Sequence, residues 1–166
     1  MRAGTKAADE HVPAMGGRPP LATLFRPVVL GLDLSRPCHD VIGFAFDAAA
    51  LRTAPLRVVH GWNSPAYFAY GAAVDPSWQA DMRAQESDAL RAALRPWREK
   101  YPGIDVIEQS VVGQPAHHLV EAGSDAGLLV IGRRSHRSRA AYPLIGHVAH
   151  AVLHHCPAPV AVVPHT

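Results

Sequence analysis

Apolar residues occur along the chain in two alternating patterns. Five short, nearly continuous apolar runs predict buried strands at residues 27–33, 56–62, 104–112, 127–131 and 159–163. The intervening segments repeat apolar residues at spacings of three and four, which predicts helices near residues 41–49, 76–101, 115–120 and 146–155. Strands that alternate with helices form right-handed crossovers and a parallel sheet covered on both faces. The pattern therefore predicts an α/β fold with a doubly wound, five-stranded parallel sheet, a Rossmann-like architecture.

Turn residues mark the ends of two predicted helices. Ser35 or Asp40 is placed to cap the first helix, and Asp75 precedes Pro76 at the start of the second. Pro96 predicts a kink inside the second helix, because proline removes one hydrogen bond of the ladder. The positions of the first helix that we expect to be buried are Val41, Phe44, Ala45, Ala48 and Ala49.

The composition is that of one globular domain. The 166 residues are 48% hydrophobic and 18% charged, and a chain of this length buries a core without help from metals or disulfides. Residues 1–25 are rich in Gly, Ala and Pro and predict a flexible leader, so we expect the folded domain to span residues 26–166. The net charge of +2 argues against nucleic acid as a partner.

Cysteine content and hydropathy bear on the compartment. Cys38 and Cys156 are too few for a disulfide framework or a zinc-binding cysteine cluster. No apolar run approaches the roughly 20 residues that a membrane span needs, and the N-terminal residues lack the apolar segment of a secretory signal. We therefore expect a cytoplasmic protein that does not associate with membranes.

The residues that follow the predicted strands are the first candidates for a binding site, because ligands of doubly wound sheets bind beyond the carboxyl ends of the strands. These residues are Asp33, His60, Gly61, Gly113 and Gly132. The Asp33 carboxylate can accept hydrogen bonds from a ribose or a base. It can equally hold a turn or cap a helix.

The segment of residues 132–139 carries four arginines within seven residues and begins at Gly132. A second glycine, Gly146, opens the helix that follows. Glycines let backbone amides approach a ligand, and helix N-termini and arginines both attract phosphate. The segment therefore predicts an anion site, with an ordinary solvated basic loop as the alternative.

These residues, taken together, resemble the universal stress protein family. The resemblance rests on the segments at residues 28–35, 58–62, 113–116, 127–132, 146–148 and 156–163, which occur in the family's order and spacing. It implies a five-stranded fold of the adenine nucleotide alpha hydrolase-like type and a cytoplasmic, regulatory stress-response protein. It also implies ATP or AMP as the ligand, with Mg²⁺ as the one metal expected, and a homodimer formed through the last strand, between Pro159 and Val163.

The family's nucleotide motif, Gly-x2-Gly-x9-Gly-Ser/Thr, suggests a role for each candidate. Asp33 would hold the ribose or adenine, and the backbone at His60 and Gly61 would contact the base. Gly113 is a further candidate for the binding site. The phosphate loop would comprise Gly132, Arg134, Ser135, Gly146 and His147.

The chain departs from that motif in four ways. Ser135 replaces the second glycine, His147 replaces the hydroxyl residue, and Leu34 replaces a small residue after the aspartate. The gap before Gly146 is also one residue longer than in the family. A nucleotide-free dimerising scaffold of the same fold is therefore the alternative to a nucleotide-binding module. A slow ATPase is a third possibility, but the chain has no Gly-x4-Gly-Lys-Ser/Thr loop and we expect no enzyme.

Three histidines, His147, His150 and His154, recur on one stripe of the last predicted helix. Such a stripe can bind a metal ion. The predicted core side of that helix runs instead through Leu144, Val148, Ala151, Val152 and His155, so the three histidines are expected to face solvent or a partner.

Overall fold

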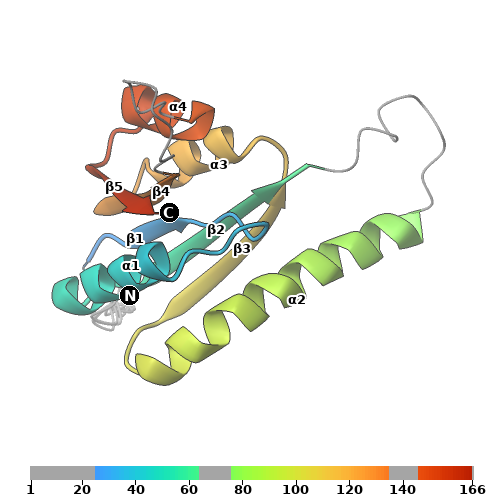
Figure 1. Ribbon diagram of the computed structural model, residues 1–166, viewed down its shortest axis with the longest axis horizontal. Helices are drawn as coiled ribbons and strands as arrows, with labels where there is room; N and C mark the ends of the chain where they lie inside the picture. Colours follow the sequence, from blue (N-terminus) through green and yellow to red (C-terminus); the bar gives the residue numbers. More distant parts are fainter. Residues whose placement is uncertain (1–24, 64–75, 135–145, 166) are drawn as a thin grey trace, which may run out of the picture.

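The computed structural model describes residues 25–63, 76–134 and 146–165. Within them the chain forms strands and helices in strict alternation (Figure 1). The order is β1 (Val28–Gly31), α1 (His39–Arg52), β2 (Leu56–Trp62), α2 (Pro76–Lys100), β3 (Val106–Val112), α3 (Pro115–Ala122), β4 (Leu128–Arg134), α4 (His147–His155) and β5 (Val160–His165). Each predicted strand and helix is present. The predicted leader lies outside the described residues, apart from Phe25.

The five strands form one parallel sheet in the order β3-β2-β1-β4-β5. Strand β1 pairs with β2 on one side, Val28 opposite Leu56, and with β4 on the other, Val28 opposite Leu128. The chain thus builds outward from β1 in both directions, which confirms the doubly wound fold. β3 and β5 are the two edges of the sheet.

Side chains of successive strand residues point to opposite faces and build two cores. Leu30, Val58 and Val130 belong to the core beneath α1 and α2, whereas Val29, Val59 and Leu129 belong to the core beneath α3 and α4. Figure 1 shows the two helix pairs on opposite sides of the sheet. Burial on both faces explains why the sequences of these strands are nearly continuous apolar runs.

Helix α1 differs from its prediction in two respects. Phe44 is 44% exposed, whereas Phe46, absent from the predicted stripe, is fully buried beside Trp97 and Tyr101. The N-cap is Cys38, which makes no side-chain cap bond, so neither Ser35 nor Asp40 caps the helix. The reason is that Ser35 is used within the turn after β1, where it bonds to Asp33.

Helix α2 runs without interruption past Pro96 to Lys100. The proline is exposed, and Trp97 and Tyr101 after it pack on Phe46 with ring centroids 5.8 and 5.3 Å apart. These aromatic contacts compensate for the missing ladder bond. Only Leu90 and Leu94 of α2 are fully buried, so the first half of the helix lies less deeply on the sheet. Within the described ranges, no helix is both long and apolar enough to cross a membrane.

Candidate functional site

A cavity of about 610 Å³ lies at the carboxyl ends of β1 and β4. The two strands are neighbours, but the chain leaves β1 for α1 on one face and leaves β4 for α4 on the other. The sheet offers a crevice where connections diverge in this way, and ligands of doubly wound proteins bind there. The polar side chains in its described lining are Asp33, Arg36, Cys38, Asn63, Arg133, His147 and His165.

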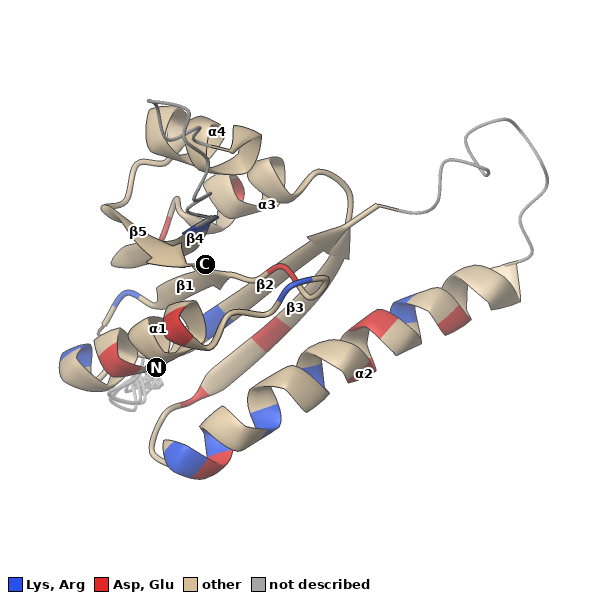
Figure 2. Cartoon of the chain, viewed as in Figure 1, with Lys and Arg blue, Asp and Glu red and all other residues tan. Residues whose placement is uncertain are grey.

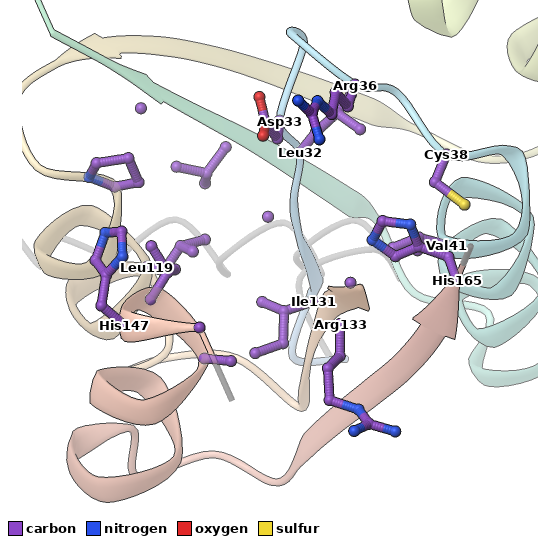
Figure 3. Close-up of a pocket in the computed structure, with 18 of the residues that line it drawn as sticks. Leu32, Asp33, Arg36, Cys38, Val41, Leu119, Ile131, Arg133, His147 and His165 are labelled. Carbon is purple, nitrogen blue, oxygen red and sulfur yellow. The ribbon is translucent and has the colours of Figure 1, made fainter. Parts of the chain in front are cut away.

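Asp33 enters this cavity from the turn after β1 (Figure 3). Its Oδ1 accepts hydrogen bonds from the Ser35 backbone N at 3.0 Å and the Ser35 hydroxyl at 2.6 Å. The Arg36 backbone N donates to the Asp33 carbonyl at 3.2 Å, which closes the turn. Asp33 is therefore a turn carboxylate that also lines the cavity.

Two glycines at strand ends allow the cavity walls to approach closely. A Cβ atom on Gly61 would lie 2.7 Å from the Pro115 Cα, so the start of α3 packs directly on the end of β2. A Cβ atom on Gly132 would lie 2.9 Å from His165 Nε2 and 3.1 Å from a Val41 methyl group. Both glycines line the cavity, and any larger residue would fill or displace its wall.

His60 stands apart from the other candidates. It is buried and is not part of the cavity lining. It points to the face covered by α2, where Nε2 lies 3.2 Å from Glu86 Oε2, and its Nδ1 lies 3.0 Å from the Leu32 carbonyl. The His60 side chain therefore points away from the cavity and is not placed to contact a ligand there.

Gly113 also lies outside the cavity lining. Its φ of 129° is accessible to glycine and places it in the turn that joins β3 to α3. Its backbone N donates to the Trp62 carbonyl at 2.8 Å, and His118 Nε2 bonds to the Val112 carbonyl at 3.0 Å. In the structure, Gly113 serves the chain reversal at the sheet edge.

The predicted phosphate loop is only partly within the described residues. Gly146 is the N-cap of α4 and His147 its first residue, and both line the cavity. Arg134 ends β4 in register with His165, and Ser135 lies outside the described residues. Arg133, one residue earlier, belongs to the described lining.

The charge around the cavity favours an anion. The described lining includes two arginines, Arg36 and Arg133, and one carboxylate residue, Asp33, and the imidazoles of His147 and His165 add hydrogen-bonding groups. Figure 2 shows that most acidic residues of the described chain lie elsewhere, many of them along α2. The N-terminus of α4 contributes unpaired backbone N–H groups at the same place.

The histidines of α4 are exposed, as expected for His150 and His154, whose ring centroids are 4.4 Å apart. His155 is exposed as well, so its predicted core position is wrong; Ala149 and Val152 are the buried residues of this helix. Across residues 25–63, 76–134 and 146–165, no three His, Cys, Asp or Glu side chains converge as metal ligands.

Residues 24–164 match the family model described as the universal stress protein family. The chain belongs to the universal stress protein family. Universal stress protein Rv2005c of Mycobacterium tuberculosis is 32% identical over 137 residues, covering 82% of this chain and 44% of the relative. The chain thus spans less than half the length of the curated relatives it matches, whereas it covers nearly all of several solved universal stress protein structures.

Two of those solved structures are complexes with a nucleotide. A universal stress protein in complex with cAMP is 23% identical, with a TM-score of 0.57 over 86% of this chain and 98% of that one. The universal stress protein from Archaeoglobus fulgidus in complex with dAMP is 24% identical, with a TM-score of 0.53 over 84% and 98%. At these identities the likeness shows the shared universal stress protein fold.

Five polar cavity residues were not among the site residues expected from the sequence: Arg36, Cys38, Asn63, Arg133 and His165. Arg133 could have been predicted from the local pattern, because Leu129 and Ile131 face the α3 side of the sheet and the period-two alternation continues to Arg133. His165 had no such signal. It reaches the cavity because β5 pairs in parallel register with β4, with Val163 opposite Gly132.

Proposed function

We propose that this universal stress protein domain is a regulatory module that binds an adenine nucleotide in the cavity between β1 and β4. The observation that carries the proposal is a cavity of about 610 Å³ at the switch point, bounded by a carboxylate at one end and by arginines and a helix N-terminus. A carboxylate suits ribose hydroxyls, and cations with free N–H groups suit phosphate. ATP or AMP is the proposed ligand, with Mg²⁺ accompanying ATP.

The related structures support this choice of ligand. Proteins of the same fold are described in complex with cAMP and with dAMP, and both ligands contain adenine, a pentose and one phosphate. We propose no robust catalysis, because a lone carboxylate that also accepts two bonds from Ser35 is poorly placed to activate a water. The domain would act in the cytoplasm through a change of contacts with a second copy or another protein.

A nucleotide-free scaffold of the same fold is the second candidate, and His165 favours it. The imidazole lies over Gly132, the residue to which the family motif assigns phosphate contact. A phosphate at that place must share the space with His165 or displace it. In the scaffold, the cavity would be structural and dimerisation through β5 the main activity.

Acid extraction of freshly purified protein followed by chromatography separates the two candidates, together with calorimetric titration of ATP and AMP. ATP or AMP in the extract, or binding at micromolar concentration, supports the nucleotide module. An empty extract and no heat at millimolar nucleotide would reject it in favour of the scaffold.

Asp33→Ala tests the carboxylate itself. We expect nucleotide affinity to fall by about tenfold or more, because a hydrogen bond to a charged group contributes about 1.5–3 kcal/mol. Ser35→Ala is the matched control, since it removes a turn hydroxyl that bonds to Asp33 Oδ1 and leaves the carboxylate in place. Equal losses in both variants would assign the effect to the turn rather than to ligand contact.

The proposed homodimer uses the β5 edge, from Pro159 to Val163. This strand pairs with β4 on one side only, and an apolar edge strand can pair with a second copy. Sedimentation equilibrium over a range of concentrations, with and without ATP, is the measurement. A monomer under all conditions would contradict the dimer.

A further inference from the structure

His60 is a buried histidine whose two ring nitrogens both face hydrogen-bond acceptors. Nδ1 lies 3.0 Å from the carbonyl oxygen of Leu32, and Nε2 lies 3.2 Å from the carboxylate oxygen Oε2 of Glu86. The side chain of His60 is 7% exposed and that of Glu86 is 27% exposed. The imidazole therefore joins the end of β1 to α2 through the interior of the domain.

This arrangement needs one proton more than a neutral imidazole and a carboxylate possess. A carbonyl only accepts, so Nδ1 must carry a hydrogen to bond Leu32. Nε2 then faces Glu86 with a lone pair unless a second proton is present, on the imidazole or on the carboxylate. With that proton the contact is a charge-assisted hydrogen bond. Without it, two acceptors oppose each other at 3.2 Å.

The polar groups on the neighbouring strand do not share this proton with the His60–Glu86 pair. Ser110 of β3 lies opposite His60 in the strand register. Glu108, two residues earlier on β3, is engaged by Arg98 of α2 at 3.2 Å. Within the described residues, His60 bonds to Leu32 and Glu86 and to neither Glu108 nor Arg98.

Titratable groups at the start of α1 and in the turn after β1 also have contacts of their own. His39 packs its ring against Trp97, with centroids 6.0 Å apart. Cys38 packs against the core beneath α1. Asp33 lies in the turn, where its Oδ1 accepts two bonds from Ser35. Glu86 is thus the charged group in direct contact with the imidazole.

The bonded carbonyl belongs to the peptide that carries Asp33. The register of β1 with β2 ends at Gly31, opposite Val59, and the Leu32 backbone N still donates to the Val59 carbonyl at 3.0 Å. Beyond that bond, the Leu32 carbonyl is hydrogen-bonded to the His60 imidazole. His60 therefore sets where the chain leaves the sheet, and so where the Asp33 turn enters the cavity.

We infer that the His60–Glu86 pair is a proton-dependent positioning device for the ligand cavity, resting on the function proposed above. With the shared proton present, His60 holds the Leu32 carbonyl and α2 together and the Asp33 turn is ordered for binding. As pH rises and the pair loses that proton, the one proton left on the imidazole can serve only one of the two acceptors. When Nε2 carries it toward Glu86, the Nδ1 lone pair faces the Leu32 carbonyl, that hydrogen bond is lost, and ligand affinity falls.

Two substitutions at His60 each retain one of its two hydrogen bonds and remove the other. The amide nitrogen of His60→Asn stands near the place of Nδ1 and keeps a donor for Leu32, whereas that of His60→Gln stands near Nε2 and keeps the contact with Glu86. We expect His60→Asn to retain ATP affinity within about threefold and His60→Gln to lose about tenfold, the effect of one buried hydrogen bond. Equal losses in both variants would overturn a positioning role through Leu32.

Glu86→Gln is the control for the proton. A glutamine amide can donate to a neutral imidazole, so this variant satisfies Nε2 without the extra proton. Hydrogen-exchange protection of residues 32–36, corrected for intrinsic exchange, is measured without nucleotide between about pH 5 and 8, the interval in which histidine usually titrates. We expect protection to fall about tenfold with rising pH in the natural sequence and to stay flat in Glu86→Gln.

The exchange experiment separates this inference from the proposed function, because it uses no nucleotide. Loss of protection with pH and no ATP binding would retain the positioning device and reject the nucleotide module. ATP binding with a flat protection profile in the natural sequence would reject the device alone. A profile in Glu86→Gln that matches the natural sequence would also overturn it.

Discussion

The two faces of the sheet use the same five strands for different purposes. Beneath α1 and α2, strand residues carry large side chains that meet an aromatic group of Phe46, Trp97 and Tyr101. Toward α3 and α4, the end of β2 carries Gly61, beside which the cavity opens, and the cavity also borders Cys38 and Val41 on the α1 side. The comparison shows that the large aromatic side chains gather on one face, whereas the cavity lies at the strand ends, where residues of both faces meet.

His60 connects the two faces. It sits on the packed side, beneath α2, yet its bond to the Leu32 carbonyl acts on the turn that enters the cavity. A residue of the stable face can thus influence the site without touching a ligand, because both sides share the backbone of β1.

The largest expected effect on stability comes from a substitution in the core beneath α1 and α2. Phe46 is fully buried, so Phe46→Ala should lower the free energy of unfolding by about 3–5 kcal/mol. Phe44→Ala is the matched control on the same helix, where a side chain 44% exposed should contribute at most about 1 kcal/mol. Urea unfolding followed by circular dichroism measures both. Similar losses in the two variants would contradict the observed orientation of α1.

A smaller effect is expected on the cavity face. In Gly61→Ala the new methyl group would meet the Pro115 backbone at 2.7 Å, so α3 must shift. We expect a loss of about 1–3 kcal/mol in unfolding free energy, together with weaker nucleotide binding. Gly103→Ala, where no atom lies within 4 Å, is the control and should change neither quantity. An unchanged affinity in Gly61→Ala would separate the α3 wall from ligand binding.

The smallest effect concerns the ion pair that joins β2 to the segment before β4. Arg57 donates two hydrogen bonds to Asp125, at 2.9 and 3.1 Å, and these bonds hold the pKa of Asp125 below its usual value of 3.8. A lowered pKa stabilises the fold above pH 3.8, and the stabilisation is lost as pH falls through the folded-state value. Because Asp125 is 60% exposed, Asp125→Asn should cost less than about 1 kcal/mol at neutral pH.

Thermal unfolding of Asp125→Asn and the natural sequence across acidic pH tests this sign. The difference between them should shrink as pH drops below about 4 and vanish when Asp125 is protonated in both states. Asp105→Asn serves as an exposed control. A difference that grows with acidity would contradict the ion pair as the source of the stabilisation.

Local sequence pattern was sufficient for the order of elements and for much of the site. Apolar runs and helical spacings predicted all nine elements of the described chain, since both periodicities are properties of neighbouring residues. The rule for doubly wound sheets then brought Asp33, Gly61 and Gly132 to one cavity, although His60 and Gly113, chosen by the same rule, lie outside its lining. Gly146 and His147, which also line the cavity, came from the glycine before the last helix and from the family motif. The cap expected from Ser35 was decided instead by its bonds to Asp33 in the turn after β1.

The sequence by itself determined that strands and helices alternate, that a carboxylate follows the first strand, and that glycines stand at strand ends. Tertiary structure alone decided which side chains meet across long separations. His60 bonds to Glu86, which lies 26 residues away, only because α2 crosses that face of the sheet. His165 covers Gly132 only because β5 pairs with β4 in one register. Such contacts depend on crossover direction and strand register, which no local periodicity contains.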